Sequence, residues 1–405
     1  MKNHRDTTSH QADSASKREL EGLLAESVED ATQRAFETFD RNSIPNCENL
    51  ILCGAGGLGR RTLAGLKSLG MVPIAFTDNN VSLHGTTVDG VLVLPPREAA
   101  ARFGRSATFV VTIWRAGGSH RYGATRRQLT ELGCSNVVSF AALYWKYFEV
   151  FLPYYCQDVP AKIIRQASAV RAGYDLWGDD QSRQEYVDQV RWRLALDFEG
   201  LTSPVGQEQY FAADLISLSD SEVFVDAGAY NGDTFRSFTE LTANKFEHYW
   251  AFEPDPINYR ALQNLIEHWP ADLQAKVTCV EAAVGSSQKT ILIEPTGTVS
   301  SATGHGSVEV PCVRLDDTLS GSSPTFLKLD IEGAEPDALI GARRIIETYA
   351  PIVTVCVYHQ QDHLWRLPLY INSISDKYSY FLRPHNEEGW DLVCYAIPHS
   401  RLRKT

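Results

Sequence analysis

The sequence predicts an α/β protein with two domains, each built on a parallel sheet. Two apolar strands run directly into glycine-rich turns, one at 54–59 and the other at 226–232. A helix-like segment follows each turn and leads to a second apolar strand that ends in an acid, Asp78 in the first half and Glu253 in the second. Repeated β-α-β units of this kind form parallel sheets with right-handed crossovers.

Composition narrows the class of protein. The chain has 405 residues, enough for two or three domains, and a net charge of −12, which argues against a broad nucleic-acid footprint. No apolar run approaches the ~18 residues that span a bilayer, and the polar N-terminus has no apolar core of a secretory signal. The eight cysteines are scattered without a CxxC pair. We therefore expect a reduced, cytoplasmic protein with no nucleic-acid partner, no membrane partner and no zinc site.

The first half is predicted as a tail, a helix and a Rossmann-like domain. Residues 1 to about 18 are polar and predicted to be disordered, and apolar spacing predicts one helix over 19–40, so that 1–45 forms an N-terminal segment. The domain spans 46–145, and a mostly helical linker or cover spans 146–215. Strands of the domain are predicted at 49–53, 72–77, 109–113 and 136–140.

The second half, 216–405, is predicted as another β-α-β series closed by a terminal hairpin. Two further β-like pieces, 290–293 and 308–315, fall inside the series. The strands of the series are predicted at 222–226, 248–253, 277–281, 325–330 and 351–358, and those of the hairpin at 378–384 and 392–397.

The two glycine turns differ in chemistry. The first reads Gly54-x-Gly56-x-x-Gly59, whereas the second is Asp-x-Gly-x-x-x-Gly, with its acid before the turn. The second resembles motif I of class I S-adenosylmethionine (SAM) methyltransferases, and Glu253, 27 residues after Asp226 (253 − 226), resembles their ribose-binding acid. SAM has no pyrophosphate and presents a cationic sulfonium, so an acidic turn suits it.

Several further stretches extend this likeness over roughly 205–400. Together and in this order they closely resemble the FkbM family of SAM-dependent O-methyltransferases. They are Val-Asp-Ala-Gly-Ala-Tyr-Asn-Gly-Asp-Thr (225–234), Phe-Glu-Pro-Asp (252–255), Glu-Ala-Ala-Val-Gly (281–285), Leu-Asp-Asp-Thr-Leu (315–319) and Phe-Leu-Lys-Leu-Asp-Ile-Glu-Gly-Ala-Glu (326–335).

The resemblance implies a class I methyltransferase fold, with a seven-stranded sheet whose last strand is antiparallel. It also implies SAM as cofactor, with Glu253 on the ribose and Asp330 beside the transferred methyl group. Ala282 and Ala283 would lie by the adenine. The methionine end would be surrounded by Asp226, Gly228, Asn231, Gly232 and Thr234.

Methyl transfer to oxygen aligns acceptor, methyl and sulfur, and it requires the hydroxyl to lose a proton. Asp330, Glu332 and His359 are the catalytic candidates. Each has an ordinary alternative: His359 could end a strand and bond to backbone, and Glu332 could cap the next helix. With Asp362 and His363 these residues could also bind a divalent metal, but no spacing fixes a geometry, so no metal is expected.

Two aromatic residues precede the first strand of the second half. In Gln209-Tyr210-Phe211 the aromatic side chains could close over SAM, as in the N-terminal cover of the family, or simply pack in the core.

The first turn also meets the context of a dinucleotide fingerprint, with Asp78 19 residues after Gly59 (78 − 59). Residues 49–115 resemble the N-terminal domain of sugar O/N-acyltransferases that bind nucleotide sugars. Gly54, Gly56, Gly59 and Asp78 are therefore a candidate nucleotide or nucleotide-sugar site. The alternative is a degenerate scaffold domain used for packing or dimerisation.

These patterns predict a SAM-dependent O-methyltransferase acting on a hydroxyl of a sugar, glycan or natural-product acceptor. One alternative is an NAD(P)-linked oxidoreductase, although no Tyr-x-x-x-Lys pair lies near the first domain. The other is a non-catalytic nucleotide-sugar-binding protein. The acceptor's identity and a homo-oligomeric assembly stay open.

Overall fold

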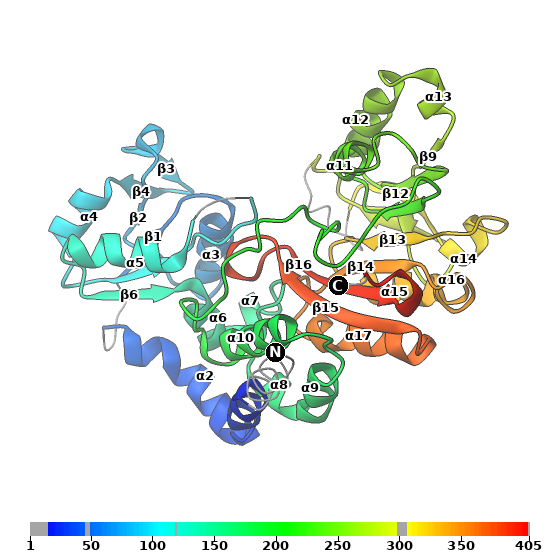
Figure 1. Cartoon of the computed structure of the whole chain (residues 1–405). Coiled ribbons are helices and arrows are strands. Elements are labelled where there is room, and N and C mark those ends of the chain that lie inside the picture. The colour runs from blue at the N-terminus through cyan, green and yellow to red at the C-terminus, as the bar shows by residue number, and fades with distance from the viewer. Residues whose placement is uncertain (1–14, 45–48, 118–119, 298–305, 404–405) are drawn as a thin grey trace, which may run out of the picture.

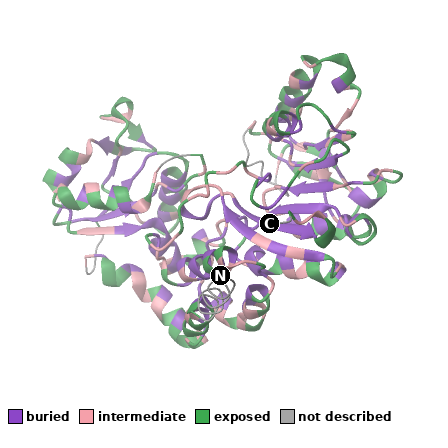
Figure 2. Cartoon of the chain, viewed as in Figure 1, coloured by how far each residue is buried: buried purple, intermediate pink, exposed green. Residues whose placement is uncertain are grey.

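The computed structural model describes residues 15–44, 49–117, 120–297 and 306–403. Figure 1 shows two sheet-containing lobes, the N-terminal one in blue and cyan and the other in green to red, joined by a layer of helices below them. The strands are the most buried part of both lobes, and the outer faces of the helices are exposed (Figure 2). The predicted α/β class with two parallel-dominated sheets is confirmed.

The N-terminal sheet has six strands in the order β3-β4-β2-β1-β5-β6, and all its pairs are parallel except β3 with β4. Its strands are β1 (Leu50–Cys53), β2 (Ala75–Thr77), β3 (Thr87–Val88), β4 (Val91–Leu94), β5 (Thr108–Val111) and β6 (Asn136–Ser139). Its helices are α3 (Gly57–Ser68), α4 (Pro96–Phe103) and α5 (Tyr122–Glu131).

One expectation for this sheet needs correction, and one hairpin was missed. The strand predicted over 72–77 begins only at Ala75. The hairpin of β3 and β4 was not predicted, although Asp89 and Gly90, which join its strands, both have positive φ, 47° and 84°. An Asp-Gly pair between apolar residues is the usual sequence of such a two-residue turn.

The N-terminal helix predicted over 19–40 is wrong as a single helix. One helix covers 15–23, and α2 (Val28–Asn42) follows a break. The new helix starts there because the Ser27 side chain accepts a hydrogen bond from Asp30 N at 3.0 Å, which satisfies a free donor of the first turn. Residues 15–18, predicted as tail, are helical, and the rest of the predicted tail lies outside the described residues.

Four helices lie in the segment 146–215, which was predicted as a mostly helical linker or cover, but its last part, 196–215, contains no helix. α10 packs on β15 of the second sheet, α9 packs on α17, and α6 packs on α2. α6 (Phe140–Lys146) ends where this segment begins, and the four helices are α7 (Phe148–Phe151), α8 (Ala161–Arg165), α9 (Ala167–Tyr174) and α10 (Asp180–Ala195).

The second sheet has seven strands in the order β15-β16-β14-β13-β7-β8-β9. Only β16, the last strand of the chain, runs antiparallel to the rest, as the family resemblance implied. The strands are β7 (Val223–Ala227), β8 (His248–Phe252), β9 (Val277–Val280), β13 (Phe326–Leu329), β14 (Ile352–Cys356), β15 (Tyr378–Pro384) and β16 (Leu392–Pro398).

Helices and a small sheet complete this lobe. The small sheet has the order β10-β12-β11, from β10 (Ala283–Val284), β11 (Lys289–Ile293) and β12 (Val308–Val313). The helices are α11 (Asp233–Leu241), α12 (Pro256–Glu267), α13 (Ala271–Gln274), α14 (Leu315–Thr318), α15 (Glu335–Gly341), α16 (Arg343–Tyr349) and α17 (His363–Ile374).

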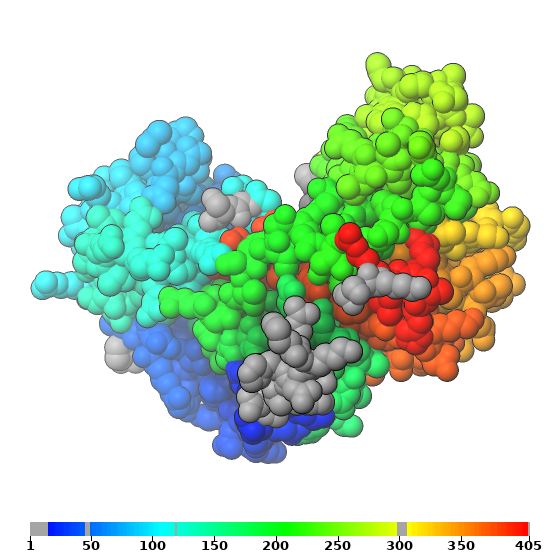
Figure 3. Space-filling view, viewed as in Figure 1, coloured from blue at the N-terminus to red at the C-terminus, as the bar shows by residue number. Residues whose placement is uncertain are grey.

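The loop between β15 and β16 joins the two lobes. Trp114 of the N-terminal lobe lies 4.5 Å from Trp390, ring centroid to ring centroid, and its Nε1 donates to the Glu388 carbonyl at 3.0 Å. The Glu388 carboxyl in turn accepts from the backbone of Tyr122. Above this junction the surface is hollowed between the lobes (Figure 3).

Candidate functional site

A cavity opens at the carboxyl ends of β7, β8 and β13, the edge where open α/β sheets bind ligands. It encloses about 820 Å³ of space, including its open mouth, which is ample for a nucleoside cofactor. Six of the nine residues expected to bind the cofactor line it: Gly228, Thr234, Glu253, Ala282, Ala283 and Asp330.

The glycine turn after β7 needs its glycines. Gly228 and Gly232 have φ of 84° and 85°, a region that favours glycine. A Cβ on Gly228 would lie 1.9 Å from the Asp330 carbonyl oxygen, so this residue lets the turn lie against the end of β13. Gly232 is the N-cap of α11 and, like Asn231, does not line the cavity.

Asp226 lies beneath the turn instead of in the cavity. It is fully buried, and its Oδ1 lies 2.9 Å from Lys328 Nζ while its Oδ2 accepts from the Tyr249 hydroxyl at 2.5 Å. Lys328 also donates to the Gly228 carbonyl at 2.6 Å. Burial lowers the pKa of Lys328, but the Asp226 and Asp330 carboxylates outweigh it and hold that pKa above its ordinary value. The acid thus anchors the turn through a charged lysine.

Lys328 was not among the predicted site residues. It sits between Leu327 and Leu329 in a strand that is buried throughout, and it lines the cavity. A lysine inside a buried strand requires a partner, so its position within an apolar run was a signal for this ion pair.

Glu253, directly after β8, is held by the backbone. Its Oε2 accepts from Tyr230 N and its Oε1 from Asp255 N, both at 2.9 Å. Burial raises the pKa of this carboxyl above its ordinary value. Each oxygen keeps a further lone pair, so the fixed carboxylate can still accept from two vicinal hydroxyls of a ligand in the cavity.

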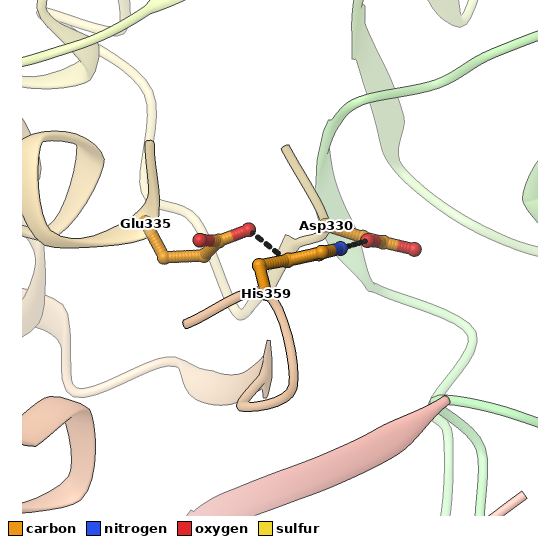
Figure 4. A group of neighbouring side chains, drawn as sticks. All are labelled: Asp330, Glu335 and His359. Carbon is orange, nitrogen blue, oxygen red and sulfur yellow. Dashed lines mark hydrogen bonds and ion pairs between the residues drawn. The ribbon is translucent and has the colours of Figure 1, made fainter. Parts of the chain in front are cut away.

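The three catalytic candidates come together at the end of β13 and β14. Figure 4 shows Glu335 and Asp330 on opposite sides of the His359 ring. His359 Nδ1 lies 2.8 Å from Glu335 Oε1, and its Nε2 lies 3.4 Å from Asp330 Oδ1 and 3.9 Å from Glu332 Oε1. Because a carboxylate only accepts, Nδ1 carries a proton. His359 therefore bonds to a side chain, and the backbone-only alternative is wrong.

Burial and neighbouring charges shift the pKa values of His359 and the carboxyls around it. Burial lowers the pKa of His359, but the Glu335 carboxylate prevails and raises it to about 10. Burial alone would raise the pKa of Glu335, yet His359 brings it to about 2. Burial raises the pKa of Glu332 to about 7.

Glu332 does not cap the next helix. The N-cap of α15 is Ala334, without a side-chain bond, and Glu335 serves the turn instead by accepting from Ile331 N at 3.0 Å. Glu332 has a φ of 54°, a strained value for a residue with a side chain, and it lines the cavity. Glu335 is the last residue of the motif at 326–335, but it was not predicted as a site residue.

The two residues of the aromatic pair lie in different surroundings. The Tyr210 hydroxyl donates to Asp330 Oδ2 at 2.5 Å, and Tyr210 lines the cavity. Phe211 packs between Phe224 and Phe326 in the core.

A second tyrosine from outside the second sheet also reaches the site. Tyr155 hydrogen-bonds to the Glu332 carboxyl, and its ring lies 4.8 Å from that of Trp390. Nothing in the sequence around this residue indicated its place.

Asp362 and His363 are the two remaining candidate metal ligands. His363 Nδ1 is 3.4 Å from Glu335 Oε2, and burial lowers the pKa of His363 to about 4. Asp362 Oδ2 lies 3.8 Å from Arg366 Nη1 of α17.

The predicted nucleotide site of the N-terminal sheet contains a backbone hydrogen bond equivalent to one in the second sheet. Asp78 Oδ2 accepts from Ala55 N at 2.8 Å, as Glu253 does from Tyr230. A Cβ on Gly59 would lie 2.0 Å from the Gly54 carbonyl, so close packing of the turn accounts for this glycine. Gly56 is the N-cap of α3, without a side-chain bond.

The second sheet has the seven strands and the antiparallel last strand that the class I methyltransferase resemblance implied. Residues 226–382 match the family model for the methyltransferase FkbM domain. A search of curated proteins found no match. In the described part of the chain, no helix is long and apolar enough to cross a membrane.

Solved structures support the fold. The methyltransferase FkbM from Methylobacillus flagellatus KT is 23% identical, with a TM-score of 0.74 over 95% of this chain and 99% of that one. The match therefore includes the N-terminal lobe. UDP-D-quinovosamine 4-dehydrogenase from Vibrio fischeri is 22% identical over 23% of this chain and 77% of that one, but its TM-score of 0.20 is too low to indicate a shared fold.

Proposed function

We propose that this methyltransferase uses SAM and transfers its methyl group to a hydroxyl of a sugar, glycan or natural product. One observation carries the proposal: Gly228, Glu253 and Asp330, from the ends of three adjacent strands, line a single cavity. A SAM site needs a turn that lets the backbone come close to the ligand, an acid for the ribose hydroxyls and an acid at the reacting end.

The rest of the cavity suits the cofactor's other groups. Ala282 and Ala283 give a small apolar wall where the adenine would lie, and Thr234 and Asp233 lie by the glycine turn at the methionine end. The carboxylates of Asp233 and Asp330 favour the cationic amine and sulfonium.

The acids at the end of β13 suit oxygen as the methyl acceptor. A hydroxyl that approached between Asp330 and Glu332 would meet fixed acceptors for its proton while it attacks the methyl group. Tyr210 holds one oxygen of Asp330 and Tyr155 bonds to Glu332, so both carboxyls are oriented before a ligand arrives. The aromatic faces of Tyr155 and Trp390 offer an apolar surface for a sugar ring.

A paired titration tests the cofactor site. S-adenosylhomocysteine should bind one site per chain by calorimetry, and Glu253→Ala should weaken it by at least about tenfold because two ribose hydrogen bonds are lost. Asp78→Ala is the matched control, since Asp78 makes the equivalent backbone bond in the other sheet. Unchanged affinity in Glu253→Ala, or loss only in Asp78→Ala, would refute the proposal.

Other expectations remain separate proposals. A nucleotide or nucleotide-sugar ligand of Gly54, Gly56, Gly59 and Asp78 stays a prediction, as do the cytoplasmic location and a homo-oligomer. Titration of the wild type with nucleotide sugars, with Asp78→Ala as the variant, would test the first of these.

A further inference from the structure

We propose that His359 Nε2, Asp330 Oδ1 and Glu332 Oε1 bind a divalent metal ion at the reacting end of the cavity. The ion's role toward the acceptor rests on the proposed function, but its binding requires neither SAM nor acceptor. The two claims can therefore fail independently.

The distances from His359 Nε2 to the two carboxylate oxygens suit a shared cation. Metal–ligand bonds of about 2.1 Å at octahedral or tetrahedral angles place neighbouring ligand atoms roughly 3.0–3.4 Å apart. His359 Nε2 already lies 3.4 Å from Asp330 Oδ1. The Glu332 oxygen lies 3.9 Å from Nε2, and its side chain, which is 24% exposed, can turn toward an ion held by the other two residues.

His359 is arranged as metal-binding histidines are. Its side chain is 1% exposed, and its Nε2 has no hydrogen-bond partner among the described residues. Its other nitrogen donates to Glu335, on the far side of the ring from Asp330 (Figure 4). A carboxylate on Nδ1 fixes the tautomer that leaves the Nε2 lone pair for a metal once the Nε2 proton is released. Glu335 is thus the outer partner and not a ligand.

The local charge also favours a cation. Four carboxyls act on the His359 ring or on one another: Asp330, Glu332, Glu335 and Asp391. Lys328, which also interacts with Asp330, is already paired with Asp226. A protonated imidazole offsets one of these charges, whereas a divalent ion offsets two.

The ligand types narrow the ion. One imidazole nitrogen with two carboxylate oxygens suits Mn²⁺, Fe²⁺ or Zn²⁺ better than the all-oxygen shells of Mg²⁺ and Ca²⁺. Asp330 and Glu332 both line the cavity, so the open positions of the ion face it. The acceptor's hydroxyl oxygen would take one of them, next to the methyl group. A substrate with two adjacent oxygens, as on a sugar ring, could take two.

Mn²⁺ binding to chelator-treated full-length protein tests the proposal. We expect one Mn²⁺ per chain by electron paramagnetic resonance, with or without S-adenosylhomocysteine. Asp330→Asn and Glu332→Gln should each weaken Mn²⁺ binding by at least about tenfold, and Glu335→Gln by about 10–100-fold through the outer partner. Asp337→Asn, an exposed acid on the same helix as Glu335, should bind as the wild type does.

Two results would overturn the proposal. Absence of Mn²⁺ binding by the wild type at about 1 mM would leave an imidazolium ion pair only. Equal binding by Asp330→Asn, Glu332→Gln and Asp337→Asn would place the ion elsewhere. Crystals soaked in Mn²⁺ give an answer that needs no variant to fold: an anomalous peak within about 2.5 Å of His359 Nε2 supports the site, and a peak only elsewhere refutes it. If the wild-type protein binds Mn²⁺ but not S-adenosylhomocysteine, the cofactor proposal is refuted and the proposed metal site is not.

Discussion

The Lys328 ammonium lies 2.9 Å from the Asp226 carboxylate, and both side chains are buried beneath the glycine turn. The same ammonium donates to the Gly228 carbonyl at 2.6 Å. One lysine on β13 therefore fixes the end of β7 and the turn that forms the cavity wall. The cavity depends on this pair even though Asp226 does not reach it.

Lys328→Met should be strongly destabilising. It leaves the Asp226 charge buried without its cation, which typically costs about 3–5 kcal/mol. Guanidinium denaturation measures the loss. The double variant Asp226→Leu/Lys328→Met removes both charges and should recover much of it. A loss below about 1 kcal/mol in the single variant would contradict the ion pair.

Gly228→Ala should disrupt the site by sterics and backbone strain together. The added Cβ would lie 1.9 Å from the Asp330 carbonyl, and φ is 84°. We expect a loss of about 2 kcal/mol or more in stability and of S-adenosylhomocysteine binding. Gly57→Ala is the control, because nothing lies within 4 Å of its Cβ. Equal behaviour of the two variants in thermal unfolding and calorimetry would refute the close approach.

Tyr210→Phe should slow turnover while leaving the fold intact. It removes the hydroxyl that donates to Asp330, a hydrogen bond to a charged group that is worth about 1.5–3 kcal/mol. We expect kcat to fall by about 10–100-fold on any acceptor that the wild type methylates. Phe211→Ala should instead destabilise the core by about 3–5 kcal/mol. Unchanged kcat in Tyr210→Phe would remove this tyrosine from the reaction.

Glu388 should make stability depend on pH at the junction of the lobes. Burial raises its pKa from 4.5 to about 7. The folded state therefore binds its proton more tightly than the unfolded state, so this stabilisation is present below about pH 4.5 and is lost as pH rises to about 7. The full shift corresponds to at most about 3 kcal/mol.

Glu388→Gln isolates this effect, since glutamine does not titrate and its oxygen can still accept from Tyr122. The difference in free energy of unfolding, wild type minus variant, should fall as pH rises from 4.5 to 7. A flat difference curve from denaturant titrations across that window would show that Glu388 does not titrate in the folded state.

Sequence patterns predicted most of the second sheet because its signals are local. Apolar strands, a glycine turn and an acid at a strand end identify β7 and β8 without reference to any distant residue. Ser27 also carried a local signal, as a helix N-cap, and so did the Asp89-Gly90 pair as a hairpin turn; both were missed.

The other parts of the site depend on contacts between distant segments. Tyr155 reaches Glu332 from the segment between the two sheets, and Tyr210 reaches Asp330 across 120 positions of the chain. Residue spacing also could not distinguish Glu335, which orients His359, from Glu332, which lines the cavity. That distinction depends on which nitrogen of the ring each acid faces.

A crystal structure with S-adenosylhomocysteine would show where the cofactor binds. We expect the ribose hydroxyls on the Glu253 carboxylate, the adenine beside Ala282 and Ala283, and the sulfur facing Asp330. Density for the ligand at Gly54–Gly59 instead, or no density in the cavity when the ligand is present well above saturation, would contradict this expectation.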